Sequence, residues 1–210
     1  IFMHLYWERW AIVNVLLWPM TAIGVFIVIM AAESYYRLTN KPALVNVTSG
    51  PGGTNAITGV YGAWTDSIGM IVISGQVKYE TTVRSTGLQL RQLGDQELDI
   101  EKLVSPITKY AEMVTDPSLI RYHLEKAFYL ATSGRPGPCW LDIPLDVQGA
   151  DIDPDTLEKF EPPILQRVDY KENSKTILEK ISKAKRPVVL AGGGVRLSGA
   201  HSEFIDVIEK

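Results

Sequence analysis

The chain has 210 residues and a formal net charge of −3, with acidic and basic side chains interspersed along its length. Domains commonly contain about 100–200 residues, so we expect one well-buried domain and part of a second. The sequence shows no basic face of the kind that neutralises nucleic-acid phosphates, so we do not expect DNA or RNA as partners.

The first thirty-two residues (1–32) form an atypical apolar N-terminus. Residues 11–32 carry no charge and are almost continuously apolar. About 20 apolar residues are enough to span a bilayer, so this run taken alone is typical of a membrane helix. A signal peptide fits less well, because its apolar core is shorter and a small-residue cleavage site follows it. We expect any helix here to be interrupted at Pro19.

After Glu33 the sequence alternates apolar, β-rich runs with helix-compatible segments, the order that produces an α/β fold with a parallel sheet flanked by helices. The strands that it predicts are Ala43–Thr48, Gly69–Gly75 and Cys139–Val147. Ligands of open α/β sheets bind at the carboxyl ends of the strands, so the turn Gly50–Gly53 and Gln76 are expected at one shared edge.

Two further features lie between these strands. Lys78–Asp99 is polar and only weakly periodic, so we expect a long surface loop or lid. A clear helix begins at Asp116 and Pro117, with the aspartate at the N-cap and the proline at the first helical position. Apolar residues then recur at helical spacing until Gly134 ends the helix.

The composition changes after the last of these strands. Residues 149–166 are acidic and carry several prolines, so we expect an interdomain linker at 150–168. Beyond the linker the sequence predicts a helix over Tyr170–Ala184, a strand over Pro187–Ala191 and a further helix from Ala200. Residues 169–210 are therefore expected to be the start of a second α/β domain, truncated by the end of the chain.

The number and spacing of the cysteines and histidines argue against an internal disulfide and against a zinc site. Cys139 is the single cysteine, so no internal disulfide can form, which suits a reducing cytoplasm. The three histidines lie far apart in sequence, and no Cys/His cluster has the spacing of zinc ligands. We therefore predict a cytoplasmic protein with no metal site made from its own residues alone.

Several blocks of the sequence match a known family in their order and separation. Val47–Ala56, with its Ser-Gly-Pro-Gly-Gly-Thr-Asn turn, resembles the strand-to-helix turn of thiamine diphosphate-dependent enzymes related to acetolactate synthase, pyruvate oxidase and benzoylformate decarboxylase. The other blocks are Met30–Arg37, Val72–Val77, and Gly134–Pro138 with Leu141–Val147. By this resemblance, residues 33–149 form an incomplete pyrimidine-binding domain, and Arg186–Gly194 begins the central domain of the family.

The resemblance implies a cofactor, a substrate class and an oligomer. In the family, thiamine diphosphate lies between the pyrimidine-binding domain of one subunit and the diphosphate-binding domain of its partner in a homo-oligomer. The latter domain holds Mg²⁺. The substrate is a 2-keto acid, which undergoes decarboxylation and carboligation. The sequence of Lys78–Asp99 departs from that of acetolactate synthases, so the individual substrate and the presence of FAD in the full-length protein stay open.

Matching the family motifs residue by residue identifies candidate site residues. The residues that match the turn near the cofactor rings are Pro51, Gly52 and Asn55, and those that match the substrate side are Gln76 and Lys109. Two ordinary interpretations stay open. Asn55 is also explained as a residue in the first turn of a helix, and Lys109 as a solvated loop lysine.

The essential glutamate of the family has no counterpart in the sequence. It stands in a His-Glu-Gln-type motif shortly before Met30, and counting back places it at Val25, so no catalytic residue is intact. The sequence also ends before the diphosphate-binding domain. We therefore expect the chain to be inactive alone, and a shifted reading frame ahead of residue 30 is one hypothesis for the loss. The alternative is a non-catalytic relic of the cofactor-binding domain, tethered to a membrane if the apolar N-terminus is genuine.

Overall fold

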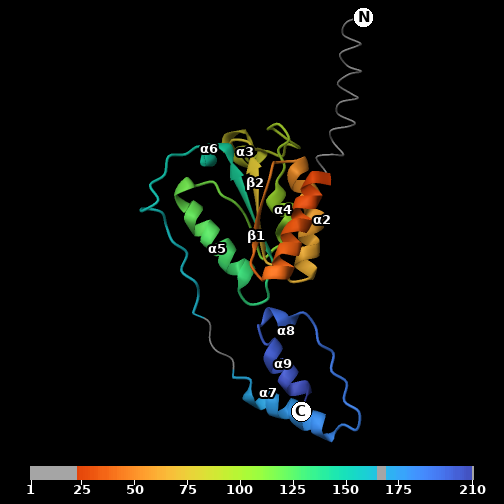
Figure 1. Ribbon diagram of the computed structural model, residues 1–210. Coiled ribbons are helices and arrows are strands. Elements are labelled where there is room, and N and C mark those ends of the chain that lie inside the picture. Colours follow the sequence, from red (N-terminus) through yellow and green to blue (C-terminus); the bar gives the residue numbers. More distant parts are fainter. Residues whose placement is uncertain (1–22, 165–168, 210) are drawn as a thin grey trace, which may run out of the picture. The chain divides into compact units, whose positions relative to one another are not determined.

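The computed structural model describes residues 23–164 and 169–209 (Figure 1). The chain divides between Pro162 and Pro163 into two compact units, unit 1 before this point and unit 2 after it. Most of the apolar run 11–32, including Pro19, lies outside the described residues. None of the described helices is long and apolar enough to cross a membrane.

Unit 1 is built on four parallel strands in the order β1-β2-β4-β3. Their bounds are Ala43–Val47 for β1, Met70–Gln76 for β2, Tyr110–Met113 for β3 and Pro138–Pro144 for β4. The predicted α/β fold is confirmed, and so are the three predicted strands. Strand β4 ends three residues earlier than predicted, because Leu145–Gln148 turns into the short helix α6.

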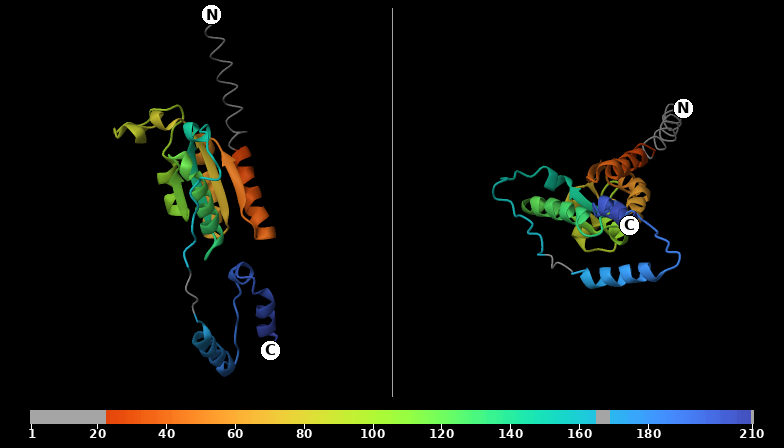
Figure 2. Two further views of the ribbon diagram at one scale, coloured as in Figure 1. Left: turned by 90° about the vertical axis from the view of Figure 1, so that its left-hand side faces the viewer. Right: turned by 60° about the horizontal axis from the view of Figure 1, so that its bottom comes forward.

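Helices pack on both faces of the sheet (Figures 1 and 2). On one face, Leu141 of β4 packs in an apolar cluster with helix α5 (Ile120–Thr132). On the other face, Trp140 lies beside helix α2 (Pro51–Thr65). Both side chains are fully buried. Because successive residues of β4 are buried on opposite faces, the strand reads as a nearly continuous apolar run in the sequence.

The helix predicted after Asp116 is present. The Asp116 carboxylate accepts a hydrogen bond from the backbone N–H of Ser118 at 2.9 Å, as an N-cap residue does. The 3₁₀ turn η3 (Pro117–Leu119) then leads directly into α5. Two residues after α5 ends, Gly134 adopts a positive φ of 59°. The predicted start and stop signals therefore both hold.

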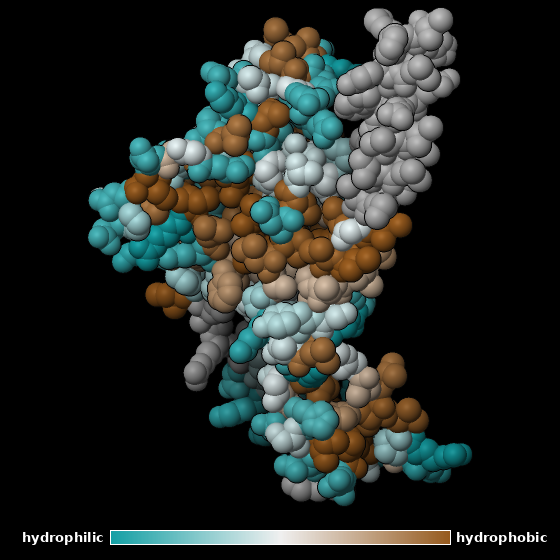
Figure 3. All heavy atoms as spheres, turned by 45° about the horizontal axis from the view of Figure 1, so that its top comes forward, coloured by the Kyte–Doolittle hydropathy of each residue, from teal (hydrophilic) through white to brown (hydrophobic). Residues whose placement is uncertain are grey.

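A helix ahead of β1 extends through residues 23–39 and packs on α2. The contact is at Gly59, where a Cβ atom would lie 2.0 Å from Cγ2 of the fully buried Ile29. Only glycine lets the two helices approach this closely. The opposite side of helix 23–39 is also apolar, and its side chains Ile23 and Ile27 are exposed. Figure 3 shows apolar side chains gathered over part of the surface of unit 1.

Residues 78–99, expected to be a long surface loop or lid, form a folded covering segment. It contains the 3₁₀ turn η1 (Tyr79–Thr81) and the short helix α3 (Val83–Thr86). The Glu97 carboxylate accepts hydrogen bonds at 2.5, 3.0 and 3.1 Å from the backbone N–H groups of Val83, Leu93 and Gly94. One carboxylate therefore fixes three points of the segment relative to one another.

Three elements between the covering segment and α5 were not apparent from the sequence. Helix α4 (Ile100–Val104) follows the covering segment and buries its first and last side chains, and the 3₁₀ turn η2 (Ser105–Ile107) continues it. Strand β3 is short, and Met113 is the one buried residue in it. A short edge strand with half-exposed, partly polar residues carries little of the apolar pattern by which strands are recognised.

A polar network is buried in the sheet on the side of α2. The Trp140 indole N–H donates to Oγ of Ser74 at 2.8 Å, and the Ser74 hydroxyl donates to Oδ1 of Asp142 at 2.5 Å. Ser74 and Asp142 are direct neighbours on β2 and β4, and each is 1% exposed. Burial raises the pKa of Asp142 to about 6, although hydrogen bonds from Ser74 and Gln76 oppose the rise.

The described part of unit 2 is helical. Its elements are α7 (Lys171–Lys183), α8 (Gly194–Leu197) and α9 (His201–Ile208). The two predicted helices are present, but the strand predicted over Pro187–Ala191 is wrong, and Val188 and Leu190 are 93% and 97% exposed. An extended segment needs a neighbouring strand to bond its backbone groups, and no strand occurs among the described residues of this unit.

The close contact at Gly59 predicts that alanine substitutions at two glycines of α2 change the stability of the fold in opposite directions. Gly59→Ala would drive a methyl group into Ile29, so the free energy of unfolding is expected to fall by about 1–3 kcal/mol. Gly62→Ala is the matched control, because a Cβ atom there would meet only Glu33, at 3.7 Å. It should raise the free energy of unfolding by about 0.5–1 kcal/mol. Urea denaturation measures both changes, and an equally stable Gly59→Ala chain would contradict the close packing.

The raised pKa of Asp142 predicts a pH-dependent stability. The native state binds this proton more tightly than the unfolded chain does, so its stabilising contribution is greatest in acid and is lost as the pH rises through about 6. Asp142→Asn does not titrate and serves as the reference. Relative to that variant, the free energy of unfolding should increase by about 1 kcal/mol between pH 7 and pH 5. Denaturant unfolding across this range tests it; a pH-independent difference would exclude the raised pKa.

Candidate functional site

The predicted site residues at the ends of β1 and β2 lie at the same edge of the sheet. The two strands are parallel and pair Val47 with Ser74, so the turn Gly50–Gly53 and Gln76 both lie where their strands end. Helix α2 begins at Pro51, within this turn. We call this the carboxyl edge, and it is where open α/β sheets bind ligands.

The glycines of the turn make room for the protein's own atoms. Gly50 has a φ of 56°, and a Cβ atom there would lie 2.6 Å from the backbone oxygen of Gln96 in the covering segment. Gly52 is buried, and its Cβ would lie 2.6 Å from Cγ2 of Thr48. Glycine is therefore required here for packing of the chain on itself, whether or not a ligand also approaches.

Pro51 and Asn55 are the predicted cofactor residues that remain accessible. Both are half-buried, and they lie in the first turns of α2 at the carboxyl edge. Among the described residues the Asn55 side-chain amide has no hydrogen-bond partner. A free amide beside an apolar proline ring can hydrogen-bond the rim of a flat heterocycle while the proline contacts its face. These two residues fit the ring portion of thiamine diphosphate.

Gln76, predicted on the substrate side, is buried and fully bonded. It is 5% exposed. Its amide nitrogen donates to Oδ2 of Asp142 at 3.0 Å and to the carbonyl oxygen of Leu98 at 2.9 Å. Its amide oxygen accepts from the backbone N–H of Val77 at 3.0 Å. The covering segment therefore lies between Gln76 and solvent, and contact with a substrate requires that segment to shift.

Asp142 is the site residue that the sequence analysis missed. It accepts from both Ser74 and Gln76, so each carboxylate oxygen has a partner although the group is buried. The signal was a single acidic residue inside an otherwise apolar strand. A buried carboxylate needs hydrogen bonds to offset its desolvation, and a polar neighbour on the adjacent strand was therefore to be expected.

Lys109 lies at the opposite edge of the sheet. It precedes β3, and its backbone N–H donates to the carbonyl of Pro138, the first residue of β4. Its side-chain ammonium donates to the carbonyl oxygen of Ser133 at 2.7 Å, and burial lowers its pKa. The structure does not bring Lys109 together with Gln76 and the turn. It also does not leave the side chain as a freely solvated lysine.

Val25, the position predicted for the family glutamate, is a half-buried residue of helix 23–39. Along this helix Ile29 lies beside Gly59 and Glu33 lies beside Gly62, so the helix runs in the same direction as α2. Val25 is therefore directed toward the carboxyl edge, whereas Glu33 lies toward the far end of α2. The Glu33 carboxylate is paired with the Arg37 guanidinium at 2.6 Å.

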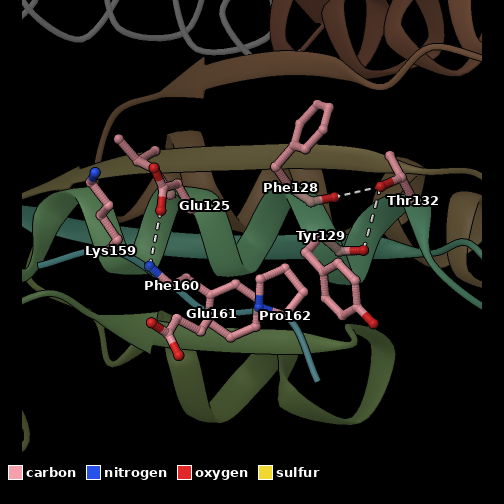
Figure 4. A pocket seen from close by; sticks show the side chains of 9 residues that line it. Glu125, Phe128, Tyr129, Thr132, Lys159, Phe160, Glu161 and Pro162 are labelled. Carbon is pink, nitrogen blue, oxygen red and sulfur yellow. Dashed lines mark hydrogen bonds between the residues drawn. The ribbon is translucent and has the colours of Figure 1, made fainter. Parts of the chain in front are cut away.

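Two further features of the described residues bear on ligand binding. They contain no group of three or more His, Cys, Asp or Glu side chains that could hold a metal ion. A mainly apolar hollow of about 750 Å³ lies beside α5, away from the carboxyl edge (Figure 4). Phe128 and Tyr129 line it together with Phe160, whose backbone N–H donates to Glu125 at 2.9 Å.

The chain is similar to acetolactate synthases over most of its length. Residues 25–103 match the model of the thiamine pyrophosphate enzyme N-terminal TPP binding domain. An acetolactate synthase of Arthrospira platensis is 38% identical over 187 residues, covering 86% of this chain and 30% of that protein. The acetolactate synthase large subunit of Lactococcus lactis subsp. lactis is 35% identical, covering 85% and 30%.

A third relative carries a different name. The glyoxylate carboligase of Escherichia coli O157:H7 is 38% identical over 167 residues, covering 78% of this chain and 26% of that protein. The chain thus spans about 30% of the length of the curated relatives it matches. Residues 25–103 of this protein therefore belong to the N-terminal TPP binding domain of the thiamine pyrophosphate enzymes, and the chain is homologous over most of its length to acetolactate synthase large subunits.

Proposed function

We propose that this chain contributes the pyrimidine side of a thiamine diphosphate site in an acetolactate synthase-type enzyme that acts on 2-keto acids. The observation that carries the proposal is the accessible pair Pro51 and Asn55 at the carboxyl edge of a domain that matches the TPP binding family. The names of the relatives, acetolactate synthase and glyoxylate carboligase, support a carboligation of small keto acids.

Each residue of the edge has a definite task in this proposal. When bound, the cofactor supplies the nucleophilic carbon and the electron sink for loss of carbon dioxide. Pro51 contacts the ring face, and the Asn55 amide hydrogen-bonds the ring rim. Gly52 shapes the turn without touching the ligand, since it is buried. Gln76 orients the substrate once the covering segment moves aside, and we do not assign Lys109 to this edge.

We propose that the rest of the cofactor is held by a different domain. Since the described residues hold no acidic cluster suited to a metal, Mg²⁺ and the diphosphate group are proposed to bind a diphosphate-binding domain of a homo-oligomeric partner. FAD is proposed only as a candidate cofactor of the full-length protein. The cytoplasmic location and the boundaries 33–149, 150–168 and 169–210 remain predictions.

A second candidate function is a non-catalytic relic of the cofactor-binding domain. The observation that favours it is the apolar Val25 within helix 23–39, at the position that motif matching predicts for the family glutamate. An apolar side chain can neither donate nor accept a proton. Binding of the cofactor without turnover would distinguish this function from that of a working subunit.

Cofactor binding at the carboxyl edge is testable by nuclear magnetic resonance of the 210-residue chain. Thiamine diphosphate at millimolar concentration should shift the backbone amide signals of residues 50–55 and leave those of residues 134–137, at the other edge, unchanged. Asn55→Ala should weaken binding about two- to tenfold, the loss of one hydrogen bond. Thr58→Ala, an exposed position of the same helix, is the control. Equal effects of the two variants would argue against the assigned contact.

Turnover is expected to be absent in the 210-residue chain supplied with thiamine diphosphate and Mg²⁺. A positioned acid–base group contributes about 10²–10⁴-fold, and Val25 supplies none. Val25→Glu should not restore activity, because a cofactor held only at its rings lacks positioning worth roughly 7–11 kcal/mol. The assay is acetolactate formation from pyruvate, with a chain carrying the family's glutamate loop and remaining domains as the positive control. Product from either of the first two chains would refute this expectation.

A further inference from the structure

We propose that Asp142 is a positioning residue for the carboxyl edge, whose buried carboxylate fixes the amide of Gln76 so that Gln76 holds the covering segment over the turn Gly50–Gly53. The inference rests on the proposed function only in calling this edge a cofactor site. The contacts that carry it lie within unit 1, on the face of the sheet that packs against α2.

The carboxylate sets the orientation of the Gln76 amide. Oδ2 of Asp142 accepts from the amide nitrogen at 3.0 Å, and a carboxylate facing the amide oxygen instead would be repelled. The backbone N–H of Val77 donates to the amide oxygen at 3.0 Å and favours the same orientation. With both contacts in place, the second N–H of the amide is aimed at the carbonyl of Leu98, 2.9 Å away.

Leu98 is one of three consecutive anchor points of the covering segment. Gln96 lies against Gly50 through its backbone oxygen. Glu97 ties together the backbone of the segment. Leu98 is the point at which the segment is bonded to the sheet through Gln76. Release of the Gln76 amide would therefore free the segment near the turn while leaving its internal Glu97 contacts intact.

The environment of Asp142 argues against a purely structural carboxylate. The charged groups that act on it most are Asp99 and Glu101, which are negative and disfavour its ionised form. It makes no ion pair among the described residues, and its partners are the neutral Ser74 and Gln76. An apolar side chain of similar size would avoid this desolvation. What the carboxylate adds is a directed acceptor for Gln76.

Four variants separate positioning from general stability. Asp142→Asn retains an acceptor for Gln76, because its amide can donate to Ser74 Oγ while its oxygen accepts from Gln76. Asp142→Leu removes the acceptor at similar volume. Gln76→Leu removes the link itself. Ser74→Ala breaks the contacts of Asp142 and Trp140 with Ser74 but leaves the bond between Asp142 and Gln76 in place.

Hydrogen exchange measured by mass spectrometry on the 210-residue chain tests the proposal. Exchange of peptides spanning residues 88–99 should accelerate about two- to tenfold in Asp142→Leu and in Gln76→Leu, the effect of losing the neutral hydrogen bond between Gln76 and Leu98. Asp142→Asn and Ser74→Ala should stay close to the parent chain. The double variant Asp142→Leu with Gln76→Leu should exchange no faster than either single variant, because both remove the same link.

Peptides from the sheet, such as residues 138–144, serve as the internal reference. Acceleration confined to residues 88–99 and restored by asparagine supports positioning. Equal acceleration of the sheet and the segment in Asp142→Leu, or equal effects of Asp142→Asn, Ser74→Ala and Asp142→Leu, overturns it. No thiamine diphosphate is present, so failure here is distinguishable from failure of the cofactor-binding experiment.

Discussion

Parallel pairing of β1, β2 and β4 is the constraint on which the carboxyl edge depends. Because β1 and β2 run in the same direction, the turn before α2 and the end of β2 meet at one place. Because β4 pairs with β2 in register, Asp142 is brought beside Ser74, within reach of Gln76. Residues from distant parts of the sequence thus share one small region through backbone pairing alone.

Helix 23–39 and α2 also run in the same direction as each other, in the helical layer beside the sheet. The close contact between Ile29 and Gly59 fixes how the two helices lie against each other, and their common direction turns Val25 toward the same edge as Asn55. The packing of the two helices therefore places Val25 and Asn55 toward the same end of the helical layer.

The sequence predicted those elements of the fold that a short stretch of residues identifies by itself. Strands β2 and β4 are largely buried, mainly apolar runs, β1 is a short β-rich run that leads into the glycine turn, and the capping aspartate before η3 and α5 is recognisable by itself. Strand β3 escaped notice because it is short and partly exposed. The segment Pro187–Ala191 looked like a strand because apolar composition does not reveal whether a partner strand is available.

At the candidate site, motif matching located the turn and Gln76 but not what surrounds them. The covering segment is ordered by Glu97 through contacts that its own composition did not suggest. The resemblance placed the turn near the cofactor rings, whereas Thr48 and Gln96 occupy the space that its glycines leave. Contacts between segments distant in the chain decide such questions, and a single sequence does not display them.

Gln96 fits against Gly50 only because position 50 has no side chain and adopts a left-handed conformation. The atom of Gln96 at the contact is its backbone oxygen, so no choice of side chain at position 96 could make room for a larger residue at position 50. A change in the backbone path of the turn therefore requires a matching change in the covering segment. A covering segment of different length or path, such as one taken from a relative, would therefore need a turn that matches it. We expect the two segments to change together between relatives.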